Sequence, residues 1–494
     1  MSLRHVVNVV GLLLVVVAIA MALSTAVALW YGDGDALGLA LSTVISAAVG
    51  FVAYRLTRFR DDIGSKEGYG IVAFAWSTIG VFGALPYLLT GSLGSIPAAV
   101  FESISGFTTT GATVFSDIES LPRGVLFWRS ITQWLGGMGI IVLVIAVLPY
   151  LGVGGMQLFR AEVPGPTTER LRPRITQTAK LLWFVYLGLT TAQVVLYLFG
   201  GLSLYDAVNH AFTTLATGGF STKNASIAAF DSAYVHYVTI VFMYLAGVNF
   251  ALHFRAVSGR PPYLREPEWR FYTGLILASS LAIALVNLTS GSYGWGLGEL
   301  ERAGRDALFQ VVSIVTTTGY ITADYELWAP GAVALILALM LTGGMAGSTG
   351  GGIKSIRILL ILKHMGIQIR RHLHPRGIFL ASVGGRKVKE EIMDDVLGFV
   401  LLYGMLAVAG IVGLALLGVD AYTSIGAVLS SLGNIGPGVG EVGAVDNYGW
   451  MSGGELGLLT LLMLVGRLEL YTVVLLFHPE MWTRTGRTAR SGLR

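Results

Sequence analysis

Four short segments rich in threonine and glycine interrupt long hydrophobic stretches of this chain. They read FTTTGAT at 107–113, LATGGFST at 215–222, VTTTGYIT at 315–322 and LGNIGPGVG at 432–440. Aligned on their central glycines, they recur at intervals of 107, 101 and 117 residues. Irregular backbone at membrane depth is tolerated only where protein buries it or where it lines a water-filled cavity. Four copies at a nearly constant period therefore predict one pore, built by four repeats within a single chain.

The composition indicates a membrane protein. Hydrophobic residues make up 54% of the 494 residues and charged residues 13%, and the mean hydropathy is +0.70. A soluble domain carries about twice that charged fraction. The chain has 65 glycines, which suits close helix packing in a membrane, and it has no cysteine, which excludes disulfides and thiolate metal sites.

Hydrophobic stretches of about 20 residues, the length needed to cross a bilayer, predict ten transmembrane helices. They lie at 6–30, 36–52, 68–89, 124–148, 179–199, 234–254, 271–288, 331–362, 396–417 and 456–477. Four runs of 13–15 residues end at the threonine- and glycine-rich segments, at 96–110, 204–217, 305–318 and 421–435. These runs are too short to span and predict re-entrant pore helices. The expected fold is an all-α integral membrane protein with about ten transmembrane helices, four re-entrant pore helices and a pseudo-four-fold pore like that of a K⁺ channel.

This pattern divides the chain into two leading helices and four units of helix, pore loop and helix. The expected boundaries are 1–66 for the leading helices and 67–176, 177–266, 267–392 and 393–494 for the four units. We assign 27 of the 33 lysines and arginines to one side of the membrane. The positive-inside rule then places both termini in the cytoplasm and the four segments on the outer side. The outer side receives Arg123, Arg129, Lys223, Arg302 and Arg305. Alternation of the basic loops with apolar spans argues against nucleic acid as a partner.

The four segments suit the binding of a dehydrated potassium ion. Backbone carbonyls can replace its water shell without the strong binding that carboxylates would impose. Glycine permits the dihedral angles that turn successive carbonyls toward one axis, and a preceding β-branched threonine stiffens the wall. The candidate K⁺-binding residues are Thr110, Gly111, Thr217, Gly218, Thr318, Gly319, Ile435 and Gly436.

Two further features stand out in the apolar segments. The run GGMAGSTGGG at 343–352 has six glycines and cannot remain a good helix. It does not fit the phosphate-binding pattern G-x-x-x-x-G-K-[ST], and a packing kink is the alternative to a functional loop. Arg467 lies in the middle of an apolar stretch, where a charge costs a few kcal/mol. The alternatives are a structural pair with Glu469 and snorkelling to the surface, but Glu469, two residues away, faces a different side of a helix, and the helix centre is too far from the surface for snorkelling.

The motifs of the chain resemble those of the TrkH branch of the Trk/Ktr/high-affinity K⁺ transporter superfamily, and the resemblance covers nearly all of it. They are LGGMGIIVL at 135–143, LGVGGMQLFRAEVPGP at 151–166, PRITQTAK at 173–180, GGMAGSTGGGIKSIR at 343–357 and GRLELYT at 466–472. The two leading helices favour this branch over the KtrB branch, which lacks them. The resemblance implies K⁺ uptake, a homodimer of pseudo-tetrameric pores, and a cytosolic nucleotide-binding regulatory partner of the TrkA type.

The resemblance also assigns roles to individual residues. It implies that 343–352 is an intramembrane gate beneath the filter and that Arg467 projects into the ion path beside it. The gating glycines would be Gly343, Gly344, Gly347, Gly350, Gly351 and Gly352. Na⁺-permeant plant relatives carry serine at the first filter glycine, so Gly111 favours selectivity for K⁺. The setting implied is the inner (plasma) membrane of a prokaryote, as a multi-pass protein surrounded by lipid.

Other functions remain to be weighed. A K⁺/H⁺ or K⁺/Na⁺ symporter, or a less selective monovalent cation transporter, would use much of the same architecture. The acidic residues that follow the four segments could concentrate cations at the pore mouth or merely solvate loops. The eight histidines are scattered, with no H-E-x-x-H motif, so we expect no enzyme activity. K⁺ is the expected transported ion, and no organic cofactor is expected in this chain.

Overall fold

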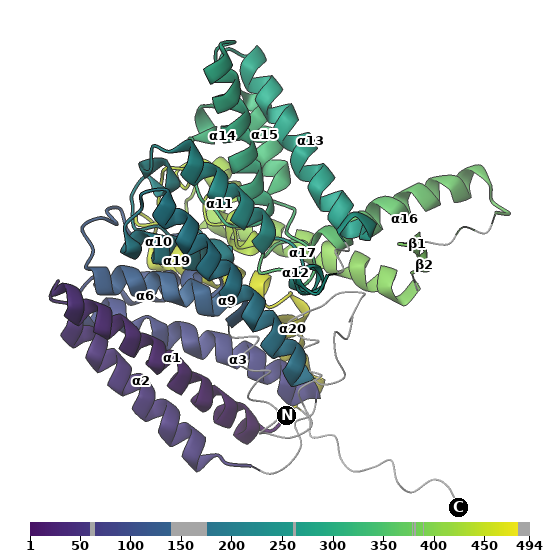
Figure 1. The fold of residues 1–494 in the computed structure, drawn as a ribbon. Coiled ribbons are helices and arrows are strands. Elements are labelled where there is room, and N and C mark those ends of the chain that lie inside the picture. Colours follow the sequence, from purple (N-terminus) through teal and green to yellow (C-terminus); the bar gives the residue numbers. More distant parts are fainter. Residues whose placement is uncertain are drawn as a thin grey trace, which may run out of the picture.

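The structure is a computed structural model that describes residues 1–59, 65–139, 175–259, 263–377, 379, 382–388 and 390–482. It is built from helices, apart from one antiparallel hairpin of β1 (Ser382–Val383) and β2 (Arg386–Lys387) in the described part (Figure 1). The all-α class expected from the sequence is therefore confirmed.

Two long antiparallel helices lead the chain, α1 (Leu3–Tyr31) and α2 (Ala36–Leu56), side by side at the lower left of Figure 1. Glycine allows their backbones to meet. A Cβ on Gly11 of α1 would lie 2.8 Å from the carbonyl oxygen of Gly50 in α2. Close approach at small residues is how helices associate where lipid supplies no hydrophobic driving force.

Four units of similar helix order follow the leading pair. The first contains α3 (Ser65–Gly83), α4 (Leu85–Leu89), α5 (Ile96–Phe107), α6 (Arg123–Trp134) and a π-helix (Leu135–Gly139). The second contains α9 (Ile175–Phe199), α10 (Leu204–Leu215), a 3₁₀ helix (Ser226–Ala229), α11 (Ala233–Ala246) and α12 (Phe250–Val257).

The third and fourth units keep this order. After a 3₁₀ turn at Tyr263–Arg265, the third contains α13 (Pro267–Thr289), α14 (Leu297–Val315), a 3₁₀ turn at Tyr325–Leu327, α15 (Pro330–Leu339), α16 (Ser355–Leu373) and the hairpin. The fourth contains α17 (Glu390–Leu416), α18 (Ala421–Gly433), α19 (Gly453–Arg467), α20 (Tyr471–Val474), a 3₁₀ turn (Leu475–Phe477) and α21 (Pro479–Trp482).

Each of the four expected short runs is helical, as α5, α10, α14 and α18. Three begin at the expected residue, but α14 begins at Leu297 rather than at 305, because its first turns are polar and lack the apolar signal. Local capping explains two of the starts. The side chain of Ser203 accepts a hydrogen bond from the amide of Asp206 before α10, and Asp420 accepts from Tyr422 and Thr423 before α18.

Six helices are long and apolar enough to cross a membrane within the described ranges, or eight if two bent pairs each count as one span. The bends are 102° between α11 and α12 and 110° between α19 and the turn Tyr471–Phe477. Two of the ten expected spans are missing from this set. The stretch 124–148 runs beyond the described residues after 139. The stretch 331–362 is not one helix: α15 ends at Leu339, an irregular segment follows, and α16 begins at Ser355.

The outer faces of the long helices carry apolar side chains. On α13, Leu277, Leu281 and Leu285 recur every four residues and are 59%, 62% and 49% exposed. Such a stripe is unusual on a soluble monomer and suits contact with lipid. Helix α16 departs from this body and projects to the right of Figure 1, where the β1–β2 hairpin is drawn below it.

Candidate functional site

The four short helices end in the same backbone turn. Its first residue with positive φ is Thr109, Thr217, Thr317 or Asn434, with φ of 54°, 54°, 59° and 55°. The next amide, that of Thr110, Gly218, Thr318 or Ile435, donates to the carbonyl five residues earlier at 2.8–2.9 Å. Non-glycine residues in the left-handed region cost about 1–2 kcal/mol each. Such strain is concentrated at functional sites, and here it recurs four times in one conformation.

The turn corrects the alignment of the second repeat by one residue. The glycines with positive φ two residues after the first strained position are Gly111, Gly219, Gly319 and Gly436. The sequence alignment used Gly218, but Gly218 is equivalent to Thr110, and Thr217 is equivalent to Thr109. The repeat intervals on equivalent glycines become 108, 100 and 117 residues (from 111, 219, 319 and 436). Two adjacent glycines in this repeat left the register ambiguous in the sequence.

These glycines and the carbonyls before them form a closed ring. A Cβ on Gly111 would lie 2.0 Å from the carbonyl oxygen of Gly218, and one on Gly219 would lie 2.0 Å from that of Thr318. A Cβ on Gly319 would lie 2.0 Å from the carbonyl oxygen of Ile435.

The ring closes where a Cβ on Gly436 would lie 2.7 Å from the carbonyl oxygen of Thr110. Each repeat therefore touches the next in cyclic order, and only glycine fits at these four positions. The structure brings seven of the eight candidate filter residues into the ring, and Thr217 lies one residue before it.

Hydroxyl side chains brace the turns from behind, a feature that sequence reasoning missed. Ser105, Ser313 and Ser430 donate to the carbonyls of Ala112, Tyr320 and Gly436 at 2.6, 2.7 and 2.6 Å. In the second repeat, Thr213 bonds the hydroxyl of Tyr320 instead. All four lie six residues before the ring glycine of their repeat, so this spacing could have revealed both the brace and the correct register.

A buried ion pair links the first two turns. Arg129 Nε lies 2.8 Å from Glu102 Oε1, and the two side chains are 1% and 0% exposed. Glu102 also accepts from the amide of Val114 at 2.9 Å, and Arg129 donates to the carbonyl of Ser221 at 3.2 Å. The prediction that Arg129 lies among outer loop charges is wrong, because α6 carries it into the protein interior.

The glycine-rich segment 343–352 lies against the ends of three of the short helices. Thr349 Oγ1 donates to the carbonyl of Leu215 at 3.0 Å, and the amide of Gly351 donates to Thr317 Oγ1 at 2.7 Å. A Cβ on Gly350 would lie 2.9 Å from the carbonyl oxygen of Thr316, and one on Gly351 would lie 2.6 Å from that of Gly433. The segment therefore covers the ring from the side where the short helices end.

Charged side chains fix this segment to the surrounding helices. Glu268 Oε1 accepts from the amides of Ala346 in the segment and Ile356 in α16, at 2.8 and 3.1 Å. The buried ammonium of Lys354 donates to the carbonyl of Gly350. Gly347 and Gly352 have φ of +77° and +63°, so the segment needs glycine there for its backbone path.

Arg467 connects the segment to the first repeat. Its guanidinium donates to the carbonyls of Thr349 and Gly136, each at 2.8 Å. The expectation that Arg467 sits in the middle of a helix is wrong, because α19 ends at this residue and the chain turns by 110°. Gly136 itself packs on the first short helix, since a Cβ there would lie 1.9 Å from the carbonyl oxygen of Phe107. The segment thus contacts the ends of three short helices, and Arg467 connects it through Gly136 to the end of the fourth.

Glu469 does not pair with Arg467, one of the alternatives from the sequence. It accepts a hydrogen bond from Arg357 Nη1 of α16 at 2.6 Å, and the guanidinium of Arg357 lies 3.8 Å from the ring centroid of Phe399. Glu469 and Leu470 have φ of 61° and 50°. The strained turn after Arg467 is thus anchored to α16.

Two acidic residues that follow the ring in the sequence connect loops of different repeats. Asp117 Oδ1 accepts from Asn224 Nδ2 at 2.9 Å, and this hydrogen bond holds the pKa of Asp117 below its ordinary value. Glu326 Oε1 accepts from the amide of Gly440 at 2.7 Å, while partial burial raises its pKa. Each contact joins loops of two different repeats, so these two carboxylates are structural partners as well as sources of negative charge.

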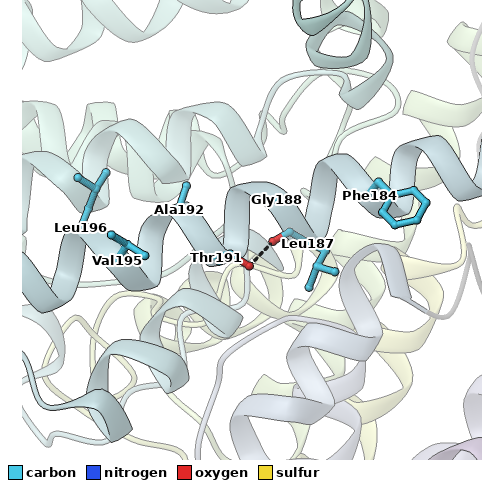
Figure 2. A pocket seen from close by; sticks show the side chains of 7 residues that line it. All are labelled: Phe184, Leu187, Gly188, Thr191, Ala192, Val195 and Leu196. Carbon is cyan, nitrogen blue, oxygen red and sulfur yellow. Dashed lines mark hydrogen bonds between the residues drawn. The ribbon is translucent and has the colours of Figure 1, made fainter.

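A hollow on the outer face of α9 is separate from the ring. Its lining comes from α9 alone, and Figure 2 shows Phe184, Leu187, Thr191 and Val195 along it. The one hydrogen bond drawn is that from Thr191 Oγ1 to the carbonyl of Leu187, at 2.9 Å.

Among the residues that the structure describes, no group of three or more His, Asp or Glu side chains could hold a metal ion. A cation bound in the ring would meet backbone oxygens instead.

Comparison with known proteins decides the family. A family model described as TrkH, cation transport protein, matches residues 38–484. The chain belongs to the TrkH family. The Trk system potassium uptake protein TrkH of Salmonella typhimurium is 40% identical to this chain over 487 residues, covering 98% of this chain and all of that protein. TrkH of Halomonas elongata is 41% identical over 492 residues, with the same coverage.

The crystal structure of the potassium transporter TrkH from Vibrio parahaemolyticus matches this structure with a TM-score of 0.87. The two are 36% identical, and the match covers 98% of this chain and all of that one. The resemblance drawn from the sequence motifs is therefore confirmed. Of those TrkH motifs, 151–166, the first two residues of 173–180 and the last four of 135–143 lie outside the described residues, whereas 343–357 and 466–472 form the segment and the turn around Arg467.

Proposed function

We propose that this chain takes up potassium ions across the inner membrane of a prokaryotic cell, with its ring of backbone carbonyls as the selectivity filter. The observation that carries the proposal is the cyclic contact of four equivalent glycines with four equivalent carbonyls. A ring of carbonyl oxygens can replace the hydration shell of K⁺. The names of the relatives, as potassium uptake proteins, agree with this cargo.

The short helices support a cation rather than an anion as the cargo. All four end where the ring begins, at Phe107, Leu215, Val315 and Gly433. The C-terminal end of a helix carries a partial negative charge, which favours a cation. The filter residues of this proposal are Thr110, Gly111, Gly218, Gly219, Thr318, Gly319, Ile435 and Gly436.

The segment 343–352 and Arg467 act as the gate in this proposal. Both lie against the filter on the side of the helix ends, and Arg467 adds a positive charge to a path for cations. Helix α16 begins three residues after the segment and reaches away from the helical body (Figure 1). A cytosolic TrkA-type nucleotide-binding partner that moved α16 could therefore move the gate.

The remaining elements of the proposal concern the assembly. The chain would work as a homodimer in lipid, with ten transmembrane helices, both termini in the cytoplasm, and units bounded at 66, 176, 266 and 392. A K⁺/H⁺ symporter is the alternative to a channel: Glu102 and Glu469 are ion-paired with arginines and are poorly suited to carry a proton, so a carboxylate without an arginine partner in the described part of the chain, such as Glu268, would have to carry it. Rb⁺ flux in liposomes with and without a pH gradient would distinguish the two.

Substitution of Gly111 by serine tests the filter. The added Cβ would lie 2.0 Å from the carbonyl oxygen of Gly218, so the ring must distort. We measure how strongly Na⁺ inhibits Rb⁺ uptake relative to K⁺. We expect this ratio to increase about tenfold, equivalent to about 1.4 kcal/mol of differential binding. Gly319→Ser, with the same clearance to Ile435, should behave alike.

Gly91→Ser is the matched control. Gly91 also has positive φ, +74°, but nothing lies within 4 Å of its added Cβ. It therefore carries the same backbone strain without crowding the ring, and its selectivity should be that of the intact protein. If folded Gly111→Ser and Gly319→Ser keep the selectivity of the intact protein, the proposal that this ring is the selectivity filter is refuted.

A further inference from the structure

The second repeat lacks a side chain where the other three have one. The residue before the ring glycine is Thr110, Thr318 or Ile435 in those repeats and Gly218 in the second. The Thr110 hydroxyl bonds that of Thr108 at 2.7 Å, and Thr318 bonds Thr316 likewise at 2.7 Å. Ile435 is fully buried. These three side chains form the wall of the ring, that is, the layer of side chains packed behind its carbonyls. Gly218 contributes no side chain to this wall.

Gln133 of α6 occupies the place that Gly218 leaves. A Cβ on Gly218 would lie 2.4 Å from Gln133 Cδ, 2.5 Å from Oε1 and 2.8 Å from Nε2. The Gln133 side chain is fully buried. It comes from the first repeat, so the wall of the second repeat is completed by its neighbour.

The Gln133 amide also bonds the strand on both sides of the ring glycine. Nε2 donates to the carbonyl oxygen of Gly218 at 2.8 Å, and the amide of Phe220 donates to Oε1 at 3.0 Å. The Gly218 carbonyl is one of the four ring oxygens. Since a carbonyl oxygen has two lone pairs, it can accept this bond and still face a cation.

We propose that Gln133 is a positioning residue that determines ion selectivity by replacing the missing side chain of Gly218 and fixing its carbonyl in the ring. Two successive glycines, Gly218 and Gly219, make this the filter strand with the greatest intrinsic backbone freedom. Discrimination between cations of different size depends on how firmly the ring oxygens are held. This inference rests on the proposed filter function.

Gln133→Leu tests the role of the amide. Leucine keeps most of the volume but loses both hydrogen bonds, each of which contributes modestly to the fixed geometry. We expect competition of Na⁺ for Rb⁺ uptake to increase about three- to tenfold in protein that elutes as folded on gel filtration. The matched control is Gln193→Leu: Gln193 is equally buried in α9, but its amide donates to Tyr197 Oη at 2.9 Å. Its selectivity should not change.

A pair of substitutions at Gly218 tests the replacement itself. Gly218 does not have positive φ, so alanine is compatible with its backbone, and the three atoms nearest to the added Cβ all belong to Gln133. Gly218→Ala alone should therefore relax selectivity. Gln133→Ala removes the obstruction together with both hydrogen bonds, so adding Gly218→Ala to that variant should cause little further loss of selectivity, whereas Gly218→Ala in the otherwise intact protein should cause a clear loss.

The results separate this inference from the filter assignment. Folded Gln133→Leu with intact selectivity, beside relaxed selectivity in Gly111→Ser, would overturn the role of Gln133 and leave the filter in place. Intact selectivity in Gly111→Ser, Gly319→Ser and Gln133→Leu would overturn both. If Gln133→Leu does not fold, Gly218→Ala decides: an equal loss of selectivity on adding it to the intact protein and to Gln133→Ala would overturn the inference.

Discussion

Arg467→Ala should increase the rate of ion uptake. The side chain donates to Thr349 in the glycine-rich segment and to Gly136 in the first repeat, each at 2.8 Å. A hydrogen bond from a charged donor contributes about 1.5–3 kcal/mol. Loss of the bond to Thr349 would therefore shift the equilibrium between covered and open filter about ten- to a hundredfold toward open, since 1.4 kcal/mol is a factor of ten. Loss of the positive charge acts in the same direction, because repulsion of cations in a low-dielectric path is weakly screened.

The assay is Rb⁺ uptake into liposomes, normalised to folded protein from gel filtration. Arg467→Lys separates the two causes, because lysine keeps the charge but lacks the planar fork that reaches two carbonyls. If Arg467→Lys takes up Rb⁺ as fast as Arg467→Ala, the effect comes from the two hydrogen bonds to Thr349 and Gly136. If Arg467→Lys has the rate of the intact protein, the effect comes from the charge. Arg302→Ala, at a side chain that is 62% exposed, is the control and should not change uptake. Folded Arg467→Ala with the uptake rate of the intact protein would refute the reasoning.

Two other predictions follow from contacts around the ring. Deletion of 343–352 should give a pore whose Rb⁺ uptake is constitutive and independent of the partner and its nucleotide. A folded deletion variant that takes up no more Rb⁺ than the intact protein and still responds to nucleotide would contradict the role of this segment as a gate. Glu102→Ala leaves Arg129 buried without its carboxylate and should lower the free energy of unfolding by about 3–5 kcal/mol. The control is Glu301→Ala, which breaks the partly exposed 3.0 Å pair with Arg305 and should cost under about 1 kcal/mol; equal thermal shifts in the two variants would contradict the burial argument.

The sequence predicted the repeated architecture because its signals are local. The short helices α5, α10 and α18 begin where their apolar runs begin, at Ile96, Leu204 and Ala421. Their ends were predicted two or three residues too late, because the last residues counted as helical belong to the strained turn. The same local signals could not decide which of Gly218 and Gly219 has positive φ.

Features that depend on distant residues were not predictable in the same way. The apolar run 456–477 conceals the turn at Arg467, since it arises at Glu469 and Leu470, two residues that rarely adopt positive φ. The pairs Glu102–Arg129 and Arg357–Glu469 join residues 27 and 112 positions apart. Gln133 carries no motif of its own, and its role depends on the missing side chain of Gly218 in another repeat.

The cyclic contact around the ring also bears on how such a chain can change over time. Each repeat meets the next through the α-carbon of a glycine and a main-chain oxygen, and every residue type supplies such an oxygen. Threonine, glycine and isoleucine all stand before the ring glycine, so drift at that position leaves the contact intact. A substitution at any one of the four glycines, by contrast, places a Cβ against a carbonyl oxygen of the next repeat in the same chain. Because the four repeats belong to one polypeptide, the side chains around the ring can differ from repeat to repeat while the contacts between glycines and carbonyls stay the same.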